Sequence, residues 1–179
     1  MTRSGIEVSK FDKQWAEEFQ SIKQVLIKSL TGFIIDIEHV GSTSVQGLGA
    51  KPIIDIDIVI ENYNNFPDVI KGLENKGYFH QKEWSFEGRE AFGRKDMYTP
   101  WDGERTQWME HHLYVCNKDS NELKRHLAFR NYLRNNPKAI IEYERLKREL
   151  ANTVKDRASY TLGKTEFINE ILAKTGIIN

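Results

Sequence analysis

Two short stretches of the chain carry residues that could do chemistry together. The first is a Gly-Ser pair, Gly41 and Ser42, which is followed directly by two more hydroxyl residues, Thr43 and Ser44. A glycine lets the backbone come close to a ligand. Hydroxyls and free backbone N–H groups at the start of a short helix bind phosphate. The first stretch therefore predicts a phosphate-binding turn.

The second stretch is an apolar segment, residues 53–60, that contains Asp55 and Asp57. Its isoleucines and valine predict a β-strand, on which alternate side chains share a face. Both carboxylates then point the same way, and the isoleucines around them point into a core. Adjacent carboxylates repel each other unless a cation lies beside them. Paired aspartate oxygens suit Mg²⁺ where phosphates are also bound, although two solvated acids on an open sheet face remain the alternative.

Neighbouring strands must bring these two stretches together. Residues 34–40 predict a strand that runs into the Gly-Ser pair. Other strands are expected at 6–10 (or an extended arm), at 78–86 and 89–98 in a hairpin around Glu87-Gly88, and at 108–116. Apolar residues at helical spacing predict helices at 12–30, at 66–76, from Asp119 or Ser120 to 135, at 137–154, and from about Thr161. This order predicts an α+β domain with a mixed, mostly antiparallel sheet and a C-terminal helical bundle.

The composition fits one compact domain over residues 1–179, with a sheet-containing core at 1–117 and a helical part at 118–179. The chain is 39% hydrophobic and 29% charged, and its apolar runs are too short to span a bilayer. Its first residues lack the apolar segment of a secretory signal, and Cys116 is its single cysteine. We therefore expect a cytoplasmic protein without disulfides or membrane association.

Charge is unevenly spread along a chain that is neutral overall. Residues 1–117 hold 13 Lys and Arg against 18 Asp and Glu, whereas residues 118–164 hold 12 against 6. An acidic sheet part facing a basic helical part could hold a metal and a polyphosphate between them, although helices also carry basic residues on solvated faces. Neutrality overall argues against strong non-specific binding of nucleic acid.

A Gly-Ser pair followed by Asp-x-Asp on the next strand resembles the nucleotidyltransferase superfamily of the DNA polymerase β type. More narrowly, the run HVGSTSVQGLGAKPIID that ends at Asp55 resembles the bacterial GrpB family, with Gln46 where that family usually has proline. The segment HLAFRNYLR that ends at Arg134, and the residues Tyr143, Lys147 and Lys164, look like its helical signature. The resemblance covers nearly the whole chain. GrpB-like domains also occur fused behind dephospho-CoA kinase.

The resemblance implies further site residues. The superfamily often carries a third carboxylate on a strand beside the Asp-x-Asp strand, and His112 takes that place here. Glu110 and Asp96 are the competing carboxylates, and a mixed set of such ligands could instead hold Zn²⁺ or Mn²⁺. Four cations are candidate phosphate contacts: Lys51, Arg130, Lys147 and Lys164. Arg130 lies among apolar positions of its helix, so a structural salt bridge is equally expected there.

Three functions are open at this point. The first is Mg²⁺-dependent transfer of a nucleotidyl group from a nucleoside triphosphate to an unknown acceptor. The second is a catalytically inactive nucleotide-binding or accessory module related to CoA biosynthesis, as the kinase fusions suggest. The third is a metal-dependent phosphohydrolase, which would need no acceptor.

Overall fold

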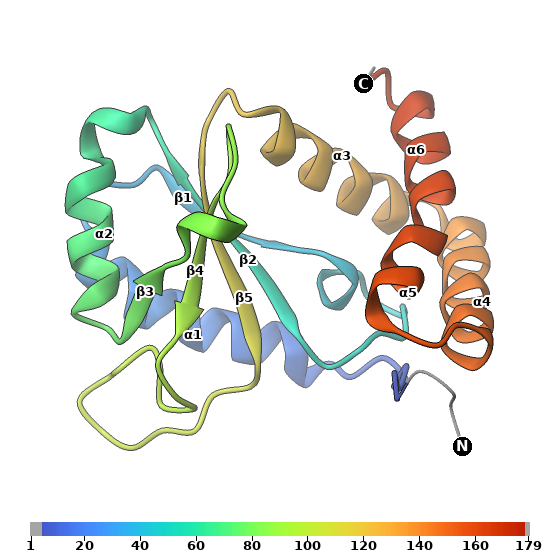
Figure 1. Cartoon of the computed structure of the whole chain (residues 1–179), viewed down its shortest axis with the longest axis horizontal. Helices are drawn as coiled ribbons and strands as arrows, with labels where there is room; N and C mark the ends of the chain where they lie inside the picture. The colour runs from blue at the N-terminus through green and yellow to red at the C-terminus, as the bar shows by residue number, and fades with distance from the viewer. Residues whose placement is uncertain (1–4, 178–179) are drawn as a thin grey trace.

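A five-stranded sheet forms the centre of the computed structural model, which describes residues 5–177 (Figure 1). The strands are β1 (Asp36–Val40), β2 (Ile54–Ile60), β3 (Tyr78–His80), β4 (Glu90–Arg94) and β5 (His111–Asn117), in the order β1-β2-β5-β4-β3. All neighbours are antiparallel except β2 and β5, which run parallel. The expected mixed, mostly antiparallel sheet is confirmed.

Helices α1 (Gln14–Leu30) and α2 (Phe66–Glu74) cover one face of this sheet. Their apolar stripes share one hydrophobic core with the isoleucines of β2. The remaining helices, α3 (Asn121–Asn135), α4 (Pro137–Thr153), α5 (Arg157–Gly163) and α6 (Thr165–Lys174), gather beside the sheet (Figure 1). A second core joins α3, α4 and α6 to the loop after β1. The chain therefore has a sheet part and a helical part, with a loop packed between them.

Strand β2 has the alternation that its sequence predicts. Ile54, Ile56 and Ile58 are fully buried in the core shared with α1 and α2. Asp55 and Asp57 lie on the opposite face, which turns toward the helical part. The carboxylates therefore lie between the two parts of the molecule, where a ligand could reach one of them.

One of two expected helix caps is confirmed. Asp12 is not the N-cap of α1, because Lys13 takes that position without a side-chain cap, although the Asp12 carboxylate accepts a hydrogen bond from the backbone N–H of Gln14 at 2.9 Å. The Ser120 hydroxyl accepts one from the N–H of Leu123 at 3.1 Å, so Ser120 is the N-cap of α3. Near the N-terminus, Ser9 forms an isolated antiparallel bridge with Ala50 in place of a longer strand.

Several boundaries differ from expectation, among them the end of β4 at Arg94 in place of residue 98 and the start of β5 at His111 in place of residue 108. The first hairpin strand ends at His80, and residues Lys82–Trp84 form a 3₁₀ turn in which the N–H of Trp84 donates to the carbonyl of Gln81. Beyond this turn, the N–H of Ala91 donates to the Ser85 hydroxyl at 2.9 Å in place of a backbone carbonyl. The last helix is two helices, because Asp156 caps a separate α5 by accepting the N–H of Ser159 at 2.8 Å. The sequence prediction missed this capping residue.

Candidate functional site

The Gly-Ser turn lies directly against the first aspartate. Val40, the last residue of β1, pairs with Asp55 of β2, so the chain turns beside that carboxylate. A Cβ at Gly41 would lie 2.3 Å from Oδ2 of Asp55, and Gly41 has a φ of 71°. A side chain would therefore meet both a steric clash and backbone strain. The structure brings Gly41, Ser42 and Asp55 together, as their spacing predicts.

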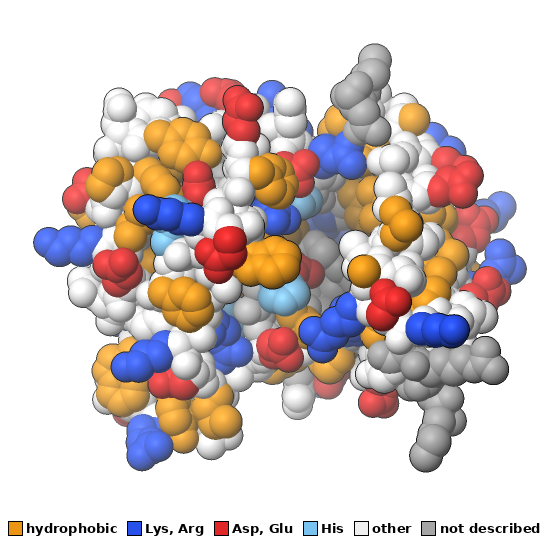
Figure 2. Space-filling view, viewed as in Figure 1, with side chains coloured by type: hydrophobic (Ala, Val, Ile, Leu, Met, Phe, Trp, Pro, Cys, Tyr) orange, Lys and Arg blue, Asp and Glu red, His pale blue; other side chains and the backbone are white. Residues whose placement is uncertain are grey.

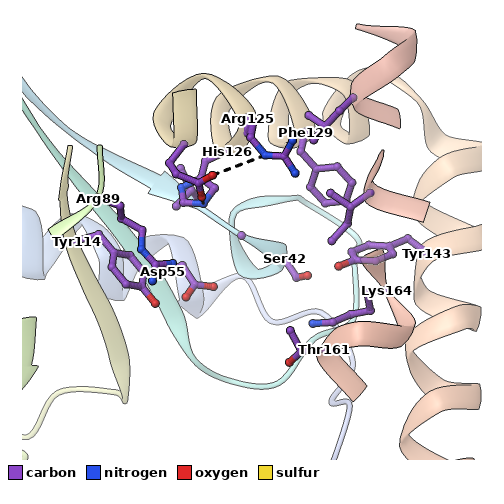
Figure 3. A pocket seen from close by; sticks show the side chains of 15 residues that line it. Ser42, Asp55, Arg89, Tyr114, Arg125, His126, Phe129, Tyr143, Thr161 and Lys164 are labelled. Atoms are coloured by element: carbon purple, nitrogen blue, oxygen red, sulfur yellow. Dashed lines mark ion pairs between the residues drawn. The ribbon is translucent and has the colours of Figure 1, made fainter. Parts of the chain in front are cut away.

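A cavity of about 410 Å³ opens at this turn, between the sheet and the helical part. Figure 2 shows the surface hollowed there, and Figure 3 shows side chains from both parts pointing into the hollow. The lining combines two acids, three cations, hydroxyls and apolar rings, among them Ser42, Asp55, Arg89, Tyr114, Glu122, Arg125, His126, Phe129, Tyr143, Thr161 and Lys164. Such a lining suits a ligand with both an anionic and an apolar portion.

Of the two aspartates predicted to hold a metal, Asp55 is the one that a molecule bound in this cavity can reach. Its side chain is 32% exposed, and Oδ1 lies 3.1 Å from Nδ1 of His112, which is its partner in the β2–β5 register. The hydrogen bond to Asp55 raises the pKa of His112 against the effect of burial. His112 is thus beside Asp55, as expected, but it lines a neighbouring hollow that also contains Glu110 and Asp96.

Asp57 has a different environment, because a histidine of α3 covers it. Its side chain is 0% exposed, and Oδ2 lies 2.6 Å from Nδ1 of His126. The other oxygen, Oδ1, is buried without a hydrogen-bond partner. Burial favours neutral His126, but the hydrogen bond and charge of Asp57 outweigh it and raise the pKa of the imidazole. Asp57 therefore has one carboxylate oxygen paired and one unsatisfied.

Sequence reasoning did not select His126 as a site residue. It lies within the helical segment that carries the family resemblance, one helical turn before Arg130. That spacing places both side chains on one face of α3. The signal was therefore present, but nothing in the local sequence pairs His126 with an aspartate 69 residues earlier.

The predicted phosphate-binding lysines separate into different places. Lys164 lines the cavity; burial and the charge of Lys51 lower its pKa to about 8, whereas Asp55 opposes the shift. Lys51 shares with Lys164 the ring of Tyr160, at 5.3 and 4.6 Å from the ring centroid. Lys147 is 2% exposed and donates to the carbonyl of Gly49, outside the cavity lining. Lys164 is the one with access to a ligand in this cavity.

Arg130 forms the salt bridge that was one of its two expectations. Its Nη1 donates to Oε2 of Glu38 at 2.6 Å and to the carbonyl of His39 at 3.0 Å, and it does not line the cavity. The hydroxyls of Thr43 and Ser44 are also engaged inside the turn, with His39 and with the carbonyl of Gly41. These residues hold the turn in place, and Ser42 is the hydroxyl that faces the cavity.

No cluster of three or more potential metal ligands occurs within residues 5–177. The structure thus offers nothing in support of a zinc site built by the protein alone. A metal at Asp55 and Asp57 would take its other ligands from water and from a bound phosphate, as Mg²⁺ commonly does.

Fold and cleft together define an α+β protein with a glycine-serine turn beside an Asp-x-Asp strand. The family model described as GrpB protein matches residues 5–174, and the chain belongs to the GrpB family. It is 32% identical over 168 residues to glutamate-rich protein GrpB of Alkalihalophilus pseudofirmus, covering 89% of this chain and 90% of that protein. It is 32% identical to protein YqkA of Bacillus subtilis over 91% of this chain but 45% of that protein.

A solved structure of the same family agrees with this assignment. The crystal structure of conserved protein GrpB from Enterococcus faecalis is similar with a TM-score of 0.78 and 32% identity, covering 94% of this chain and 96% of that one. A fainter likeness, with a TM-score of 0.49 and 10% identity, is to Cid1 in complex with its short product ApU, over 77% of this chain and 40% of that one. That likeness is too weak to indicate an activity for this chain. No helix within residues 5–177 has the length and apolar character needed to cross a bilayer.

Proposed function

We propose that the cleft binds a nucleoside triphosphate together with Mg²⁺ and transfers its nucleotidyl group to an acceptor. The observation that carries this proposal is the position of Ser42, Asp55 and Lys164 around one cavity (Figure 3). A hydroxyl, a carboxylate and a cation at these places suit a phosphate chain that is bound partly through a metal ion and partly through the protein.

The two aspartates fit Mg²⁺ in their chemistry. Both lie on one face of β2, and Oδ1 of Asp57 is a buried oxygen that lacks a partner. Mg²⁺ is commonly held by one or two carboxylates, water and substrate phosphates. When bound, the ion screens the charge that develops on the phosphates. Asp57 is 0% exposed and His126 holds its second oxygen, Oδ2, at 2.6 Å, so for both aspartates to serve, the groups that bury Oδ1 have to move.

The protein's own residues account for the rest of the proposed reaction. Ser42 and Lys164 would hold the phosphates that leave, while the ring of Phe129 offers an apolar surface for the base. An acceptor oxygen would attack the α-phosphorus, the bond to the β-phosphate would break, and pyrophosphate would leave. The acceptor's proton would pass to solvent.

Calorimetric titration tests this proposal. Each of the four ribonucleoside triphosphates is titrated, with Mg²⁺, into the wild type and into the variants Asp55→Asn and Asp57→Asn. The exposed Asp68→Asn on α2 is a matched control. We expect at least one triphosphate to bind, and affinity to fall about tenfold or more in both cleft variants but not in the control. Binding that survives both changes, or no binding of any triphosphate, would overturn the proposal.

A second function is favoured by one observation. His126 occupies an oxygen of Asp57, so the cleft as it stands suits nucleotide binding without catalysis, as an accessory module for a partner such as an enzyme of CoA biosynthesis would need. Incubating α-labelled triphosphates with the protein and cell extract separates the two. An enzyme releases pyrophosphate and labels an acceptor, and a binding module does neither.

A further inference from the structure

Arg89 at the edge of the cavity is held between two aromatic rings. It follows the turn before β4, and its guanidinium carbon lies 4.4 Å from the centroid of the Phe86 ring and 4.3 Å from that of the Tyr114 ring. Stacking on two rings fixes the plane of a guanidinium while it leaves the edges free to donate hydrogen bonds. Arg89 is therefore oriented before any ligand arrives.

This cation has no anionic partner among the described residues. The ion pairs of arginine there join Arg125, Arg130, Arg145 and Arg148 to glutamates, and none includes Arg89. Its Nη2 donates to the carbonyl of Trp84 at 3.3 Å, and its Nε is buried without a hydrogen-bond partner. A guanidinium without a carboxylate partner favours an anion, and the N–H groups at its Nη end, of which one donates to Trp84, are the ones left for it.

Arg89 also lies apart from the predicted phosphate contacts. In Figure 3, Asp55 lies between two groups of side chains: Arg89 and Tyr114 on the sheet side, and Ser42, Thr161 and Lys164 on the helical side. A triphosphate on Ser42 and Lys164 would leave the sheet side of Asp55 open to a second ligand. Apart from Arg125, which pairs with Glu122, the cations of the lining thus lie on both sides of Asp55.

We infer that Arg89 binds an oxyanion, a carboxylate or a phosphate, of the second ligand, which in the proposed function is the acceptor. The guanidinium fork matches two oxygens of such a group, and the flanking rings keep it facing the cleft. This inference rests on the proposed function for the identity of the first ligand. The anion site itself depends on the stacked, uncompensated guanidinium alone.

The probes are inorganic phosphate and acetate, titrated by calorimetry into the full chain. Each is titrated into the free protein and into protein saturated with Mg²⁺ and a non-hydrolysable ATP analogue. The variants are Arg89→Gln, Arg89→Lys and Phe86→Leu. Arg105→Gln is the matched control, because Arg105 also stacks on a ring, that of Tyr98 at 4.8 Å, yet is exposed and outside the cavity lining.

We expect one of the two probes to bind the loaded wild type, and its affinity to fall about tenfold or more in Arg89→Gln. Arg89→Lys, which keeps the charge but lacks the fork, and Phe86→Leu, which removes one ring, should lie between wild type and Arg89→Gln. The ATP analogue should bind all variants within about twofold. The probe that binds more tightly tells whether the acceptor carries a phosphate or a carboxylate.

Three results would overturn the inference. The first is that neither probe binds the wild type. The second is that Arg89→Gln binds the probes as tightly as wild type does. The third is that Arg89→Gln lowers the affinity for the ATP analogue while the probes do not bind the loaded protein, which would assign Arg89 to the triphosphate. If no nucleotide binds at all, the proposed function fails. An Arg89-dependent phosphate or acetate affinity in the free protein would still support the anion site. Phe86→Leu, at a 48% exposed residue, gives the answer should Arg89→Gln unfold.

Discussion

Replacing Gly41 by alanine should disturb the cleft where it is most crowded. The new Cβ would lie 2.3 Å from Oδ2 and 3.0 Å from Cγ of Asp55, so the carboxylate must rotate away. The backbone at Gly41, with φ 71° and ψ −174°, lies in a region that other residues rarely adopt, at a cost of about 1–3 kcal/mol. Moving Asp55 off its preferred rotamer adds about 1 kcal/mol.

Gly32→Ala separates the two contributions. Gly32 also has a positive φ, 86°, but a Cβ there would meet nothing within 4 Å. The Gly32→Ala variant should lose about 1–2 kcal/mol of its free energy of unfolding from backbone strain alone. Gly41→Ala should lose about 2–4 kcal/mol, which is roughly 4–16 °C in Tm for a chain of this size. Thermal unfolding measures the stability, and calorimetric titration with Mg²⁺ and ATP measures binding.

The affinity for nucleotide should fall about tenfold or more in Gly41→Ala and stay at the wild-type value in Gly32→Ala. Equal Tm changes in the two variants would refute the packing of Asp55 against the turn. A destabilised Gly41→Ala that binds nucleotide as wild type does would refute the need for a correctly placed Asp55 carboxylate.

Other predictions follow from buried charges and from the single thiol. Burial lowers the pKa of Lys147 to about 7 from 10.5, so between these pH values the unfolded chain binds this proton and the folded state does not. The free energy of unfolding of the wild type, measured by denaturant titration relative to Lys147→Met, should therefore rise between about pH 7 and 10. Arg130→Ala should lower the free energy of unfolding by about 2 kcal/mol, because it leaves Glu38 unpaired. Arg145→Ala removes an exposed ion pair and should lower it by about 0.5 kcal/mol or less in the same measurement. Burial raises the pKa of Cys116, so a thiol reagent should modify it in denaturant and scarcely in the native state.

Much of the fold could be predicted because its signals are local. The alternation of isoleucine and aspartate in β2 follows from the two-residue period of a strand, and the structure confirms it. The capping side chain of Ser120 marks the start of α3 within three residues of itself. Where a local signal was overlooked, as with Asp156, the boundary was wrong.

The candidate site could be predicted in part. Gly41, Ser42 and Asp55 come together because consecutive antiparallel strands place the end of one beside the start of the next. Lys164 reaches the same cavity, while Lys147, of the same residue type in the same helical part, does not. Sequence spacing cannot separate these two lysines, because both lie near apolar residues at helical spacing. In the structure, Lys147 lies within α4 and Lys164 is the turn residue between α5 and α6.

By itself, then, the sequence determined the strand that carries Asp55 and Asp57, the glycine turn beside it, and the family. The tertiary structure alone decided that His126 covers Asp57 and that Arg89 lies between Phe86 and Tyr114 without a carboxylate. The spacing of apolar residues and the capping of helices each involve a few neighbouring residues of one segment, so both can be read from the local sequence. Which side chain meets a carboxylate 69 residues away depends on how α3 packs against the sheet, and that is set by burial of the apolar surface as a whole.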